Sequence, residues 1–301
     1  MKKGLSFVLA AALCVAAITG CGNSAKETKA ETKAETTAET TAETAAETGA
    51  ETSGAAEAGT KLTVAASPTP HAEILNAAKE MMAEKGIELE VIEFTDYVQP
   101  NKVVDAGDVD ANYFQHFPYL ENFNVEQGTK LVSAGSIHYE PLGIYPGKSS
   151  DLANIADGAE IIVPNDATNE ARALLLLEVN GVITLKEGAG LNATANDIDE
   201  NPHNVKIVEM EAAQIARAVA DADFVVLNGN YALQANFNVE TDALAKEEAD
   251  SEAAQTYGNI IAVREGDEER PEIKTLVEVL KSDEIKSYIE TTYEGAVLPL
   301  D

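Results

Sequence analysis

The chain has 301 residues and a formal net charge of −31, with 52 acidic side chains against 21 basic ones. A protein this acidic is repelled by nucleic acids and by anionic membrane surfaces, so we expect neither class of partner. The two cysteines are Cys14 and Cys21, which leaves the chain after residue 21 without a disulfide, a catalytic thiol or a cysteine-ligated zinc ion. A chain of this length buries enough apolar surface to fold without such links.

The N-terminus has the pattern of an export signal. Met1–Lys3 form a short basic head, and an apolar run from Leu5 to Ile18 leads to Thr19-Gly20-Cys21. This run is shorter than the about 20 residues that a membrane-spanning helix needs, and it ends in small residues typical of a cleavage site. A cysteine at that point resembles the bacterial lipobox, in which acyl chains anchor the protein. We therefore expect a signal peptide over residues 1–20, lipidation of Cys21 and a location on the extracytoplasmic face of the cell membrane.

Residues 21–60 form a low-complexity acidic segment. Ala-Glu-Thr recurs at a period of four residues, and no aromatic or branched aliphatic side chain occurs between residues 22 and 59. Such a segment cannot bury a core, so we expect a disordered spacer. A helix with one acidic stripe is the alternative, although like charges four residues apart oppose it.

From Lys61 onward the composition becomes that of a globular protein in which strands and helices alternate. Pro70 and Gly86 flank the first helix at the positions that suit the start and end of a helix. The predicted elements are strands at 62–66, 88–94, 110–114, 130–138, 142–145, 160–163, 205–209, 224–227 and 259–263, with helices at 71–85, through 103–104, and at 118–126, 169–180, 212–220, 273–281 and 284–292.

This alternation predicts an α/β fold with parallel sheets covered by helices. The strand–helix pattern runs through two cycles that join near residues 139–145. We therefore expect two lobes. The first comprises residues 61–140, the second residues 141–257, and residues 258–301 return to the first.

Ligands of open α/β sheets bind beyond the carboxyl ends of the strands. In the first lobe this rule selects Tyr97, Phe114, His116 and Tyr119, which follow or end the second and third predicted strands. Aromatic side chains there belong either to the core or to a binding site. We expect Phe117 and Phe123 in the core, whereas the polar tips of His116 and Tyr119 need partners and favour a site.

In the second lobe the same rule selects Asn165, Asn169 and Arg172, which follow the strand at 160–163. A helix that begins there has unpaired N–H groups that attract an anion, and an arginine beside it can hold a carboxylate with two hydrogen bonds. The alternative is a plain capped helix with Arg172 in a surface ion pair, for example to Glu170. Asn228 at another strand end adds an amide that both donates and accepts.

Several segments resemble the NlpA/MetQ family of methionine-binding lipoproteins. The resemblance runs from about Lys61 to the C-terminus and is carried by FTDYVQPN, DANYFQHFPYL, PNDATNEARALLLLE, ENPHNVKIVEME and LNGNYA. It implies the two-lobed fold of type II periplasmic-binding proteins, with a ligand cleft between the lobes. It also implies that Tyr97, Phe114, His116 and Tyr119 surround a thioether, that Arg172 holds the carboxylate, and that Asn169, Asn228 and Asn165 hold the polar end of the ligand. Sulfur packs favourably against aromatic rings, in agreement with the first of these roles.

The function implied by the resemblance is that of the substrate-binding lipoprotein of an ABC importer, which captures methionine and delivers it to the membrane permease. A methionine-containing dipeptide, D-methionine or another small anionic solute is the alternative ligand. A surface adhesin and a lipid-anchored enzyme are further alternatives. For an enzyme, the four histidines, His71, His116, His138 and His203, are scattered and belong to no nucleophile or metal-binding motif. We therefore expect neither catalysis nor a cofactor nor a metal ion.

Overall fold

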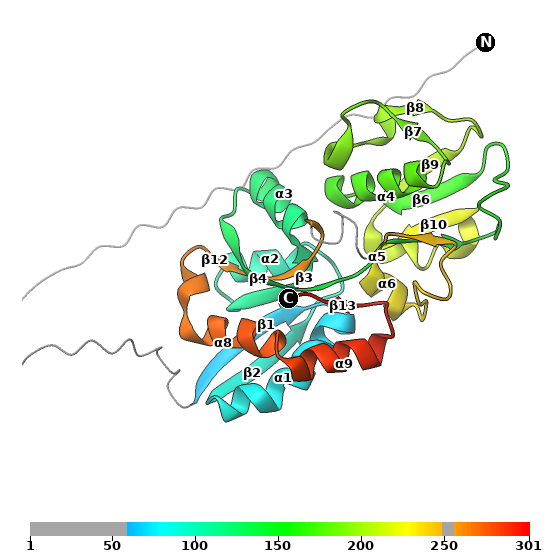
Figure 1. Cartoon of the computed structure of the whole chain (residues 1–301). Helices are drawn as coiled ribbons and strands as arrows, with labels where there is room; N and C mark the ends of the chain where they lie inside the picture. Colours follow the sequence, from blue (N-terminus) through cyan, green and yellow to red (C-terminus); the bar gives the residue numbers. More distant parts are fainter. Residues whose placement is uncertain (1–58, 249–255) are drawn as a thin grey trace, which may run out of the picture. The chain divides into compact units, whose positions relative to one another are not determined.

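The computed structural model describes residues 59–248 and 256–301. The expected signal peptide, Cys21 and nearly all of the expected spacer therefore lie outside the described residues. The described part contains a six-stranded and a five-stranded sheet, each flanked by helices, and a small two-stranded sheet (Figure 1). None of its helices combines the length and the apolar character needed to cross a bilayer.

The first sheet has the strand order β13-β4-β12-β3-β1-β2. Its strands are β1 Thr60–Ala66, β2 Ile87–Glu93, β3 Ala111–His116, β4 Leu131–Tyr139, β12 Asn259–Arg264 and β13 Leu298–Pro299. β1 runs parallel to β2 and β3, but β12 runs antiparallel to both β3 and β4. The expectation of parallel pairing therefore holds among β1, β2 and β3 and fails at β12. The reason is that β12 enters from the second sheet, from the edge at which β3 ends.

Alternating side chains of the first sheet build a core on each face. Leu62 and Val64 of β1 pack on the side of three helices, α1 Glu73–Glu84, α8 Pro271–Leu280 and α9 Asp283–Tyr293. Ala65, which follows Val64 in the strand and points to the other face, belongs to a separate cluster with Val104 and Leu120. These come from the helices on the opposite face, α2 Gln99–Asp105 and α3 Phe117–Gln127. The period of two in the strand therefore assigns each side chain to one face.

The second sheet has the order β11-β5-β10-β6-β9 and is also mixed. Its strands are β5 Gly143–Pro146, β6 Glu160–Pro164, β9 Lys206–Met210, β10 Phe224–Leu227 and β11 Ala245–Lys246. β6 is parallel to β9 and β10, whereas β5 is antiparallel to β10. One face is covered by α4 Ala167–Val179, whose Leu174 and Leu177 pack with Ile161 and Val163.

Short helices cover the other face of the second sheet. The helix expected at 212–220 ends early. α5 spans Ala212–Ile215, the backbone leaves the helical region at Ala218, and a 3₁₀ turn follows at Val219–Asp221. α6 Gly229–Gln234 and the hairpin of β7 Thr184–Leu185 with β8 Ile198–Glu200 were not expected from the sequence.

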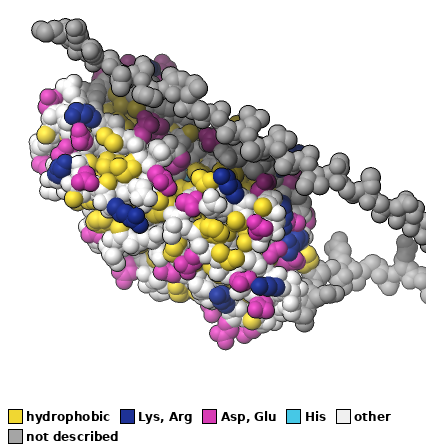
Figure 2. Space-filling view, turned by 180° about the vertical axis from the view of Figure 1, so that it is seen from behind, with side chains coloured by type: hydrophobic (Ala, Val, Ile, Leu, Met, Phe, Trp, Pro, Cys, Tyr) yellow, Lys and Arg dark blue, Asp and Glu magenta, His cyan; other side chains and the backbone are white. Residues whose placement is uncertain are grey.

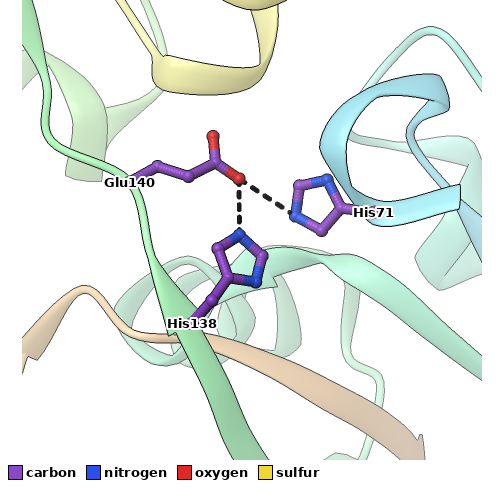
Figure 3. A group of neighbouring side chains, drawn as sticks. All are labelled: His71, His138 and Glu140. Carbon is purple, nitrogen blue, oxygen red and sulfur yellow. Dashed lines mark hydrogen bonds and ion pairs between the residues drawn. The ribbon is translucent and has the colours of Figure 1, made fainter. Parts of the chain in front are cut away.

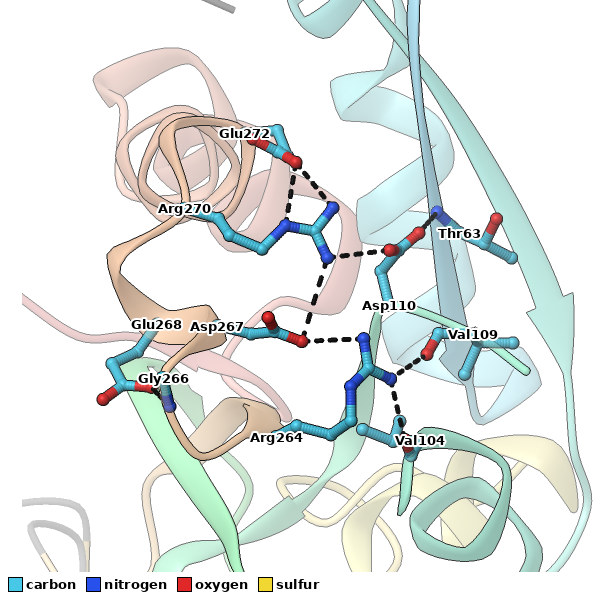
Figure 4. A network of polar contacts seen from close by, with 10 residues as sticks. All are labelled: Thr63, Val104, Val109, Asp110, Arg264, Gly266, Asp267, Glu268, Arg270 and Glu272. Atoms are coloured by element: carbon cyan, nitrogen blue, oxygen red, sulfur yellow. Dashed lines mark hydrogen bonds and ion pairs between the residues drawn. The ribbon is translucent and has the colours of Figure 1, made fainter. Parts of the chain in front are cut away.

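A network of two arginines fixes the turn between β12 and α8 to the first sheet (Figure 4). Arg264 Nη1 donates to the backbone oxygens of Val104 and Val109, at 2.8 and 2.9 Å. Arg270 Nη1 lies 2.9 Å from Asp110 Oδ1, and the other oxygen of Asp110 accepts from the backbone N–H of Thr63 at 2.8 Å. The half-buried charges thus satisfy backbone groups in β1, near the end of α2 and just before β3, and their role is structural.

Acidic side chains are spread over the surface rather than gathered at one place. On the face shown in Figure 2, they lie between basic and apolar side chains across the whole described part. A dispersed charge of this kind favours solubility and gives no electrostatic focus for a particular ligand. The position of the ligand site therefore follows from local geometry and not from the distribution of surface charge.

Candidate functional site

A cavity with an empty volume of about 330 Å³ lies where elements of the two sheets meet. It is lined by Tyr97, Phe114, Gln115, His116, Tyr119, Glu140, Asn169, Arg172, Asn228, Gly229, Asn230 and Asn259. Seven of the eight residues predicted for the ligand site are in this set. They come from the segment between β2 and α2, from the ends of β3 and β10 and from the first half of α3 and α4, as the strand-end rule anticipates.

Aromatic rings from the first sheet form one wall of the cavity. The ring centroid of Tyr97 lies 5.7 Å from that of Phe114 and 5.8 Å from that of Tyr119, and Phe123 packs behind them. The hydroxyl of Tyr119 donates to the backbone oxygen of Tyr97 at 3.0 Å, so its polar tip is satisfied within the wall. Phe117, expected in the core, is 44% exposed because it begins α3 and its side chain points outward.

His116 caps α3 and connects the two sheets. Its Nδ1 accepts the backbone N–H of Tyr119 at 3.2 Å, so the ring hydrogen sits on Nε2. Nε2 then donates to Asn169 Oδ1 at 3.1 Å. Burial, with the positive charge of Arg172 as a second cause, lowers the pKa of His116 to about 3. The side chain is therefore a neutral hydrogen-bond donor at pH 7.

The amides of the second sheet are ordered by this donor. Asn169 Oδ1 also accepts from Asn228 Nδ2 at 2.9 Å, and Asn169 Nδ2 donates to Asp166 Oδ1 at 2.9 Å. This orientation leaves Asn228 Oδ1 buried with no partner among the described residues, and Asn230 Nδ2 is in the same state. Buried polar atoms are nearly always paired. Here they offer one acceptor and one donor to a bound molecule.

Arg172 is buried and forms an ion pair that the sequence did not suggest. Its Nε and Nη2 lie 2.7 and 2.5 Å from the two carboxylate oxygens of Glu247, not of Glu170. Nη2 also donates to the backbone oxygen of Glu140 at 2.8 Å, and the guanidinium carbon lies 4.5 Å from the ring centroid of Tyr257. Burial is the largest single influence and lowers the pKa of Arg172, but Glu247, Tyr139 and Tyr257 together raise that pKa above its usual value, so the guanidinium stays charged. Its Nη1 makes no hydrogen bond to a described residue.

The start of α4 does not provide the free anion site that its sequence allowed. Asp166 caps the helix, and its carboxylate accepts the backbone N–H of Asn169 at 3.0 Å. The alternative of a capped helix therefore holds. Asn165, the remaining predicted site residue, precedes this cap, is exposed and lies outside the cavity.

Glu140 belongs to the cavity wall and was not selected from the sequence. Its carboxylate faces two buried histidines (Figure 3), with Oε1 2.7 Å from His138 Nε2 and 3.3 Å from His71 Nε2. His71 Nε2 also lies 3.0 Å from Oδ1 of Asn259, a second wall residue that was missed. The available signal was the spacing of His138 and Glu140, which places two polar side chains on one face of a strand end that is otherwise apolar.

Comparisons with known proteins show the family to which this chain belongs. A model of the NlpA lipoprotein family matches residues 62–300. The methionine-binding lipoprotein MetQ of Bacillus subtilis is 43% identical over 254 residues, which are 82% of this chain and 91% of that protein. A crystal structure of a lipoprotein from Ruminococcus gnavus is 64% identical, with a TM-score of 0.80, and covers 80% of this chain and 99% of its own.

A nutrient-binding protein from Burkholderia cenocepacia, solved with bound methionine, is 43% identical with a TM-score of 0.76. The similarity covers 80% of this chain and 100% of that one. The predicted two-lobed fold of substrate-binding proteins is confirmed by such similarities. The family match spans nearly all described residues, and the chain belongs to the NlpA lipoprotein family.

Proposed function

We propose that this protein binds methionine on the extracytoplasmic face of the cell membrane and delivers it to the permease of an ABC importer. The observation that carries the proposal is the composition of one cavity. An aromatic wall lies on one side of it, and Arg172 with the unpaired amide atoms of Asn228 and Asn230 lies on the other. A free amino acid with an apolar, polarisable side chain matches both walls, because its side chain suits the aromatic wall and its charged end suits the polar wall.

The aromatic wall suits a thioether. Tyr97, Phe114 and Tyr119 present both ring faces and ring edges, with interplanar angles from 38° to 80°. A sulfur atom gains about 0.3–1.5 kcal/mol from each such aromatic contact. The hydroxyl of Tyr97 is already bonded to Asn230, and that of Tyr119 to the backbone oxygen of Tyr97. The surface that the three rings offer to a ligand is therefore mainly apolar.

The polar wall suits the carboxylate of an amino acid. The hydrogen bonds of Arg172 to described residues use Nε and Nη2 and leave Nη1 for a ligand. Asn230 Nδ2 is a donor that is buried without a partner among the described residues. Together they provide charge-assisted hydrogen bonds to a carboxylate. Asn169 lines the same wall, but its amide is fully used by His116, Asn228 and Asp166. We assign it the role of orienting Asn228.

The relatives support the transport role. MetQ of Bacillus subtilis is named a methionine-binding lipoprotein, and a structure from Coxiella burnetii, 38% identical, is described as a periplasmic substrate-binding protein of an ABC transporter. Such relatives are binding proteins rather than enzymes. We place the lipid anchor at Cys21 and assign the lobes to residues 61–140 with 258–301 and to residues 141–257, with residues 21–60 as the spacer.

Calorimetry on unfolded and refolded protein tests the proposal, because refolding removes a copurified ligand. The panel is L-methionine, D-methionine, glycyl-methionine, L-alanine and L-serine. We expect L-methionine to bind at least about tenfold more tightly than alanine, a difference of about 1.4 kcal/mol. Tighter binding of D-methionine or the dipeptide would change the assigned ligand, and no binding of any of the three thioethers would refute the function.

A further inference from the structure

We propose that Glu140 recognises the α-ammonium group of the ligand, and that His138 and His71 position its carboxylate for this contact. The inference rests on the proposed binding of a free amino acid. It concerns the one cavity residue with a negative charge, which follows β4 at the point where the chain crosses from the first sheet to the second.

Hydrogen bonds fix one oxygen of this carboxylate. The hydroxyl of Tyr113 bonds to His138 Nδ1, and since the tyrosine keeps its proton, Nδ1 accepts and the ring hydrogen sits on Nε2. His138 Nε2 therefore donates to Glu140 Oε1 at 2.7 Å. His71 Nε2 lies between two acceptors, Glu140 Oε1 at 3.3 Å and Asn259 Oδ1 at 3.0 Å, and so also carries a hydrogen.

The carboxylate also accepts the backbone N–H of Asn230. Its other oxygen, Oε2, lies beside Gly229, where a Cβ would be only 2.7 Å from it, and both Glu140 and Gly229 line the cavity. Asn228, the residue before Gly229, contributes the buried oxygen Oδ1 that has no partner among the described residues. Glu140 and Asn228 thus offer two acceptors at adjacent points of one wall, as an ammonium group requires.

The charges of the site lead to the same assignment. Arg172 is neutralised by Glu247 with two hydrogen bonds, and it reaches the backbone oxygen of Glu140 rather than the carboxylate. His71 and His138 are neutral at pH 7, because burial lowers their pKa values to about 4 and about 3. The Glu140 carboxylate therefore has donors but no cation of its own among the described residues. The ammonium group of an amino acid supplies that cation.

Two histidines and a carboxylate also form a common ligand set for transition metals. The distances favour a proton-linked network instead. His138 Nε2 and Glu140 Oε1 are 2.7 Å apart, which is a direct hydrogen bond. Two ligands on one tetrahedral zinc ion are separated by about 3.3 Å, given bonds of about 2.0–2.1 Å.

The test compares L-methionine with its α-hydroxy analogue, 2-hydroxy-4-(methylthio)butanoate, which keeps the thioether and the carboxylate but lacks the ammonium group. Calorimetry is done on wild type, Glu140→Gln and the control Glu170→Gln. Glu170 is also buried and accepts a backbone N–H, from Ala195 at 2.9 Å, but it does not line the cavity. We expect Glu140→Gln to weaken methionine binding by about 30-fold to several thousand-fold and to change binding of the hydroxy analogue by less than about threefold. The control should change neither.

Tyr113→Phe keeps the inference testable if Glu140→Gln does not fold, because it removes one hydroxyl and retains the ring. Loss of the bond that sets the His138 tautomer should weaken methionine binding about fivefold and spare the hydroxy analogue. Equal losses for both ligands in a folded variant, or unchanged methionine binding, would overturn the inference. Wild type that binds the hydroxy analogue as tightly as methionine would also overturn it while leaving the thioether site intact. Wild type that binds neither would refute the proposed function itself.

Discussion

Replacing Arg172 with methionine separates its structural role from its role toward a ligand. The substitution keeps the length of the side chain but leaves the Glu247 carboxylate buried, 9% exposed, without its cation. Breaking a buried ion pair in this way costs about 3–5 kcal/mol of unfolding free energy. For a folded part of this size, that loss lowers the thermal midpoint by about 6–20 °C.

A second substitution should restore stability but not binding. Glu247→Gln in the Arg172→Met background removes the unpaired charge and retains an acceptor for the hydroxyl of Tyr139 and the backbone N–H of Leu142, at 2.6 and 3.0 Å. We expect the double variant to recover most of the lost stability, so that the double-mutant cycle gives a coupling above about 2 kcal/mol.

The assays are urea unfolding followed by circular dichroism and calorimetry with L-methionine. The double variant should be folded and should bind methionine at least about 30-fold more weakly than wild type, since the carboxylate of the ligand loses its charged partner. A single variant destabilised by less than about 1 kcal/mol would show that the ion pair is not buried as described. A double variant that binds like wild type would remove Arg172 from the ligand site.

Three further predictions address the wall, the pH response and the anchor. Tyr119→Ala should reduce the preference for methionine over alanine by about 2- to 10-fold in calorimetry, because a ring contact to sulfur is lost. An unchanged ratio would place the thioether elsewhere. Thermal midpoints should fall from pH 7.5 to pH 5, because burial holds the pKa of His116 near 3 while the unfolded chain takes up its proton near pH 6.5. His71 and His138 act in the same direction, whereas the raised pKa of Glu140 opposes them. His116→Gln should flatten this slope. A flat wild-type profile would contradict the neutral buried histidines. Mass spectrometry of exported protein should show an acylated Cys21, and Cys21→Ser should be released from membranes. Equal release of wild type would contradict the anchor.

Local sequence patterns located most elements because those patterns act within a few residues. The strand expected at 62–66 is β1, Thr60–Ala66, and the helix expected at 284–292 is α9, Asp283–Tyr293. Strand direction depends on contacts between distant segments. β12 lies antiparallel beside β3, some 150 residues earlier, and no local pattern encodes that pairing. The parallel sheet inferred from alternation therefore failed at β12 and at β5.

The same distinction applies to the site. Tyr97, His116 and Arg172 could be selected because each lies just beyond a strand end, which local patterns define. Glu247 and Glu140 could not be selected in this way, because the strand ends used for the selection did not point to them. Glu247 sits in a run of charged residues typical of a solvated surface, and it becomes a site residue only through Arg172, 75 residues away. The partners of both residues follow from the fold, and the sequence near them carries a signal only for Glu140, in its spacing from His138 at a strand end.

Hydrogen bonds across the cavity suggest how occupancy is coupled to the arrangement of the sheets. Tyr97 to Asn230 and His116 to Asn169 join elements of the two sheets. The same arrangement leaves Asn228 Oδ1 and Asn230 Nδ2 buried with no partner among the described residues, at a cost of about 1–3 kcal/mol for each atom. Water would satisfy both atoms if the sheets moved apart, whereas a bound amino acid satisfies them in place. We therefore expect ligand binding to favour the assembled arrangement by about 2–6 kcal/mol, roughly 30-fold to 10⁴-fold in population.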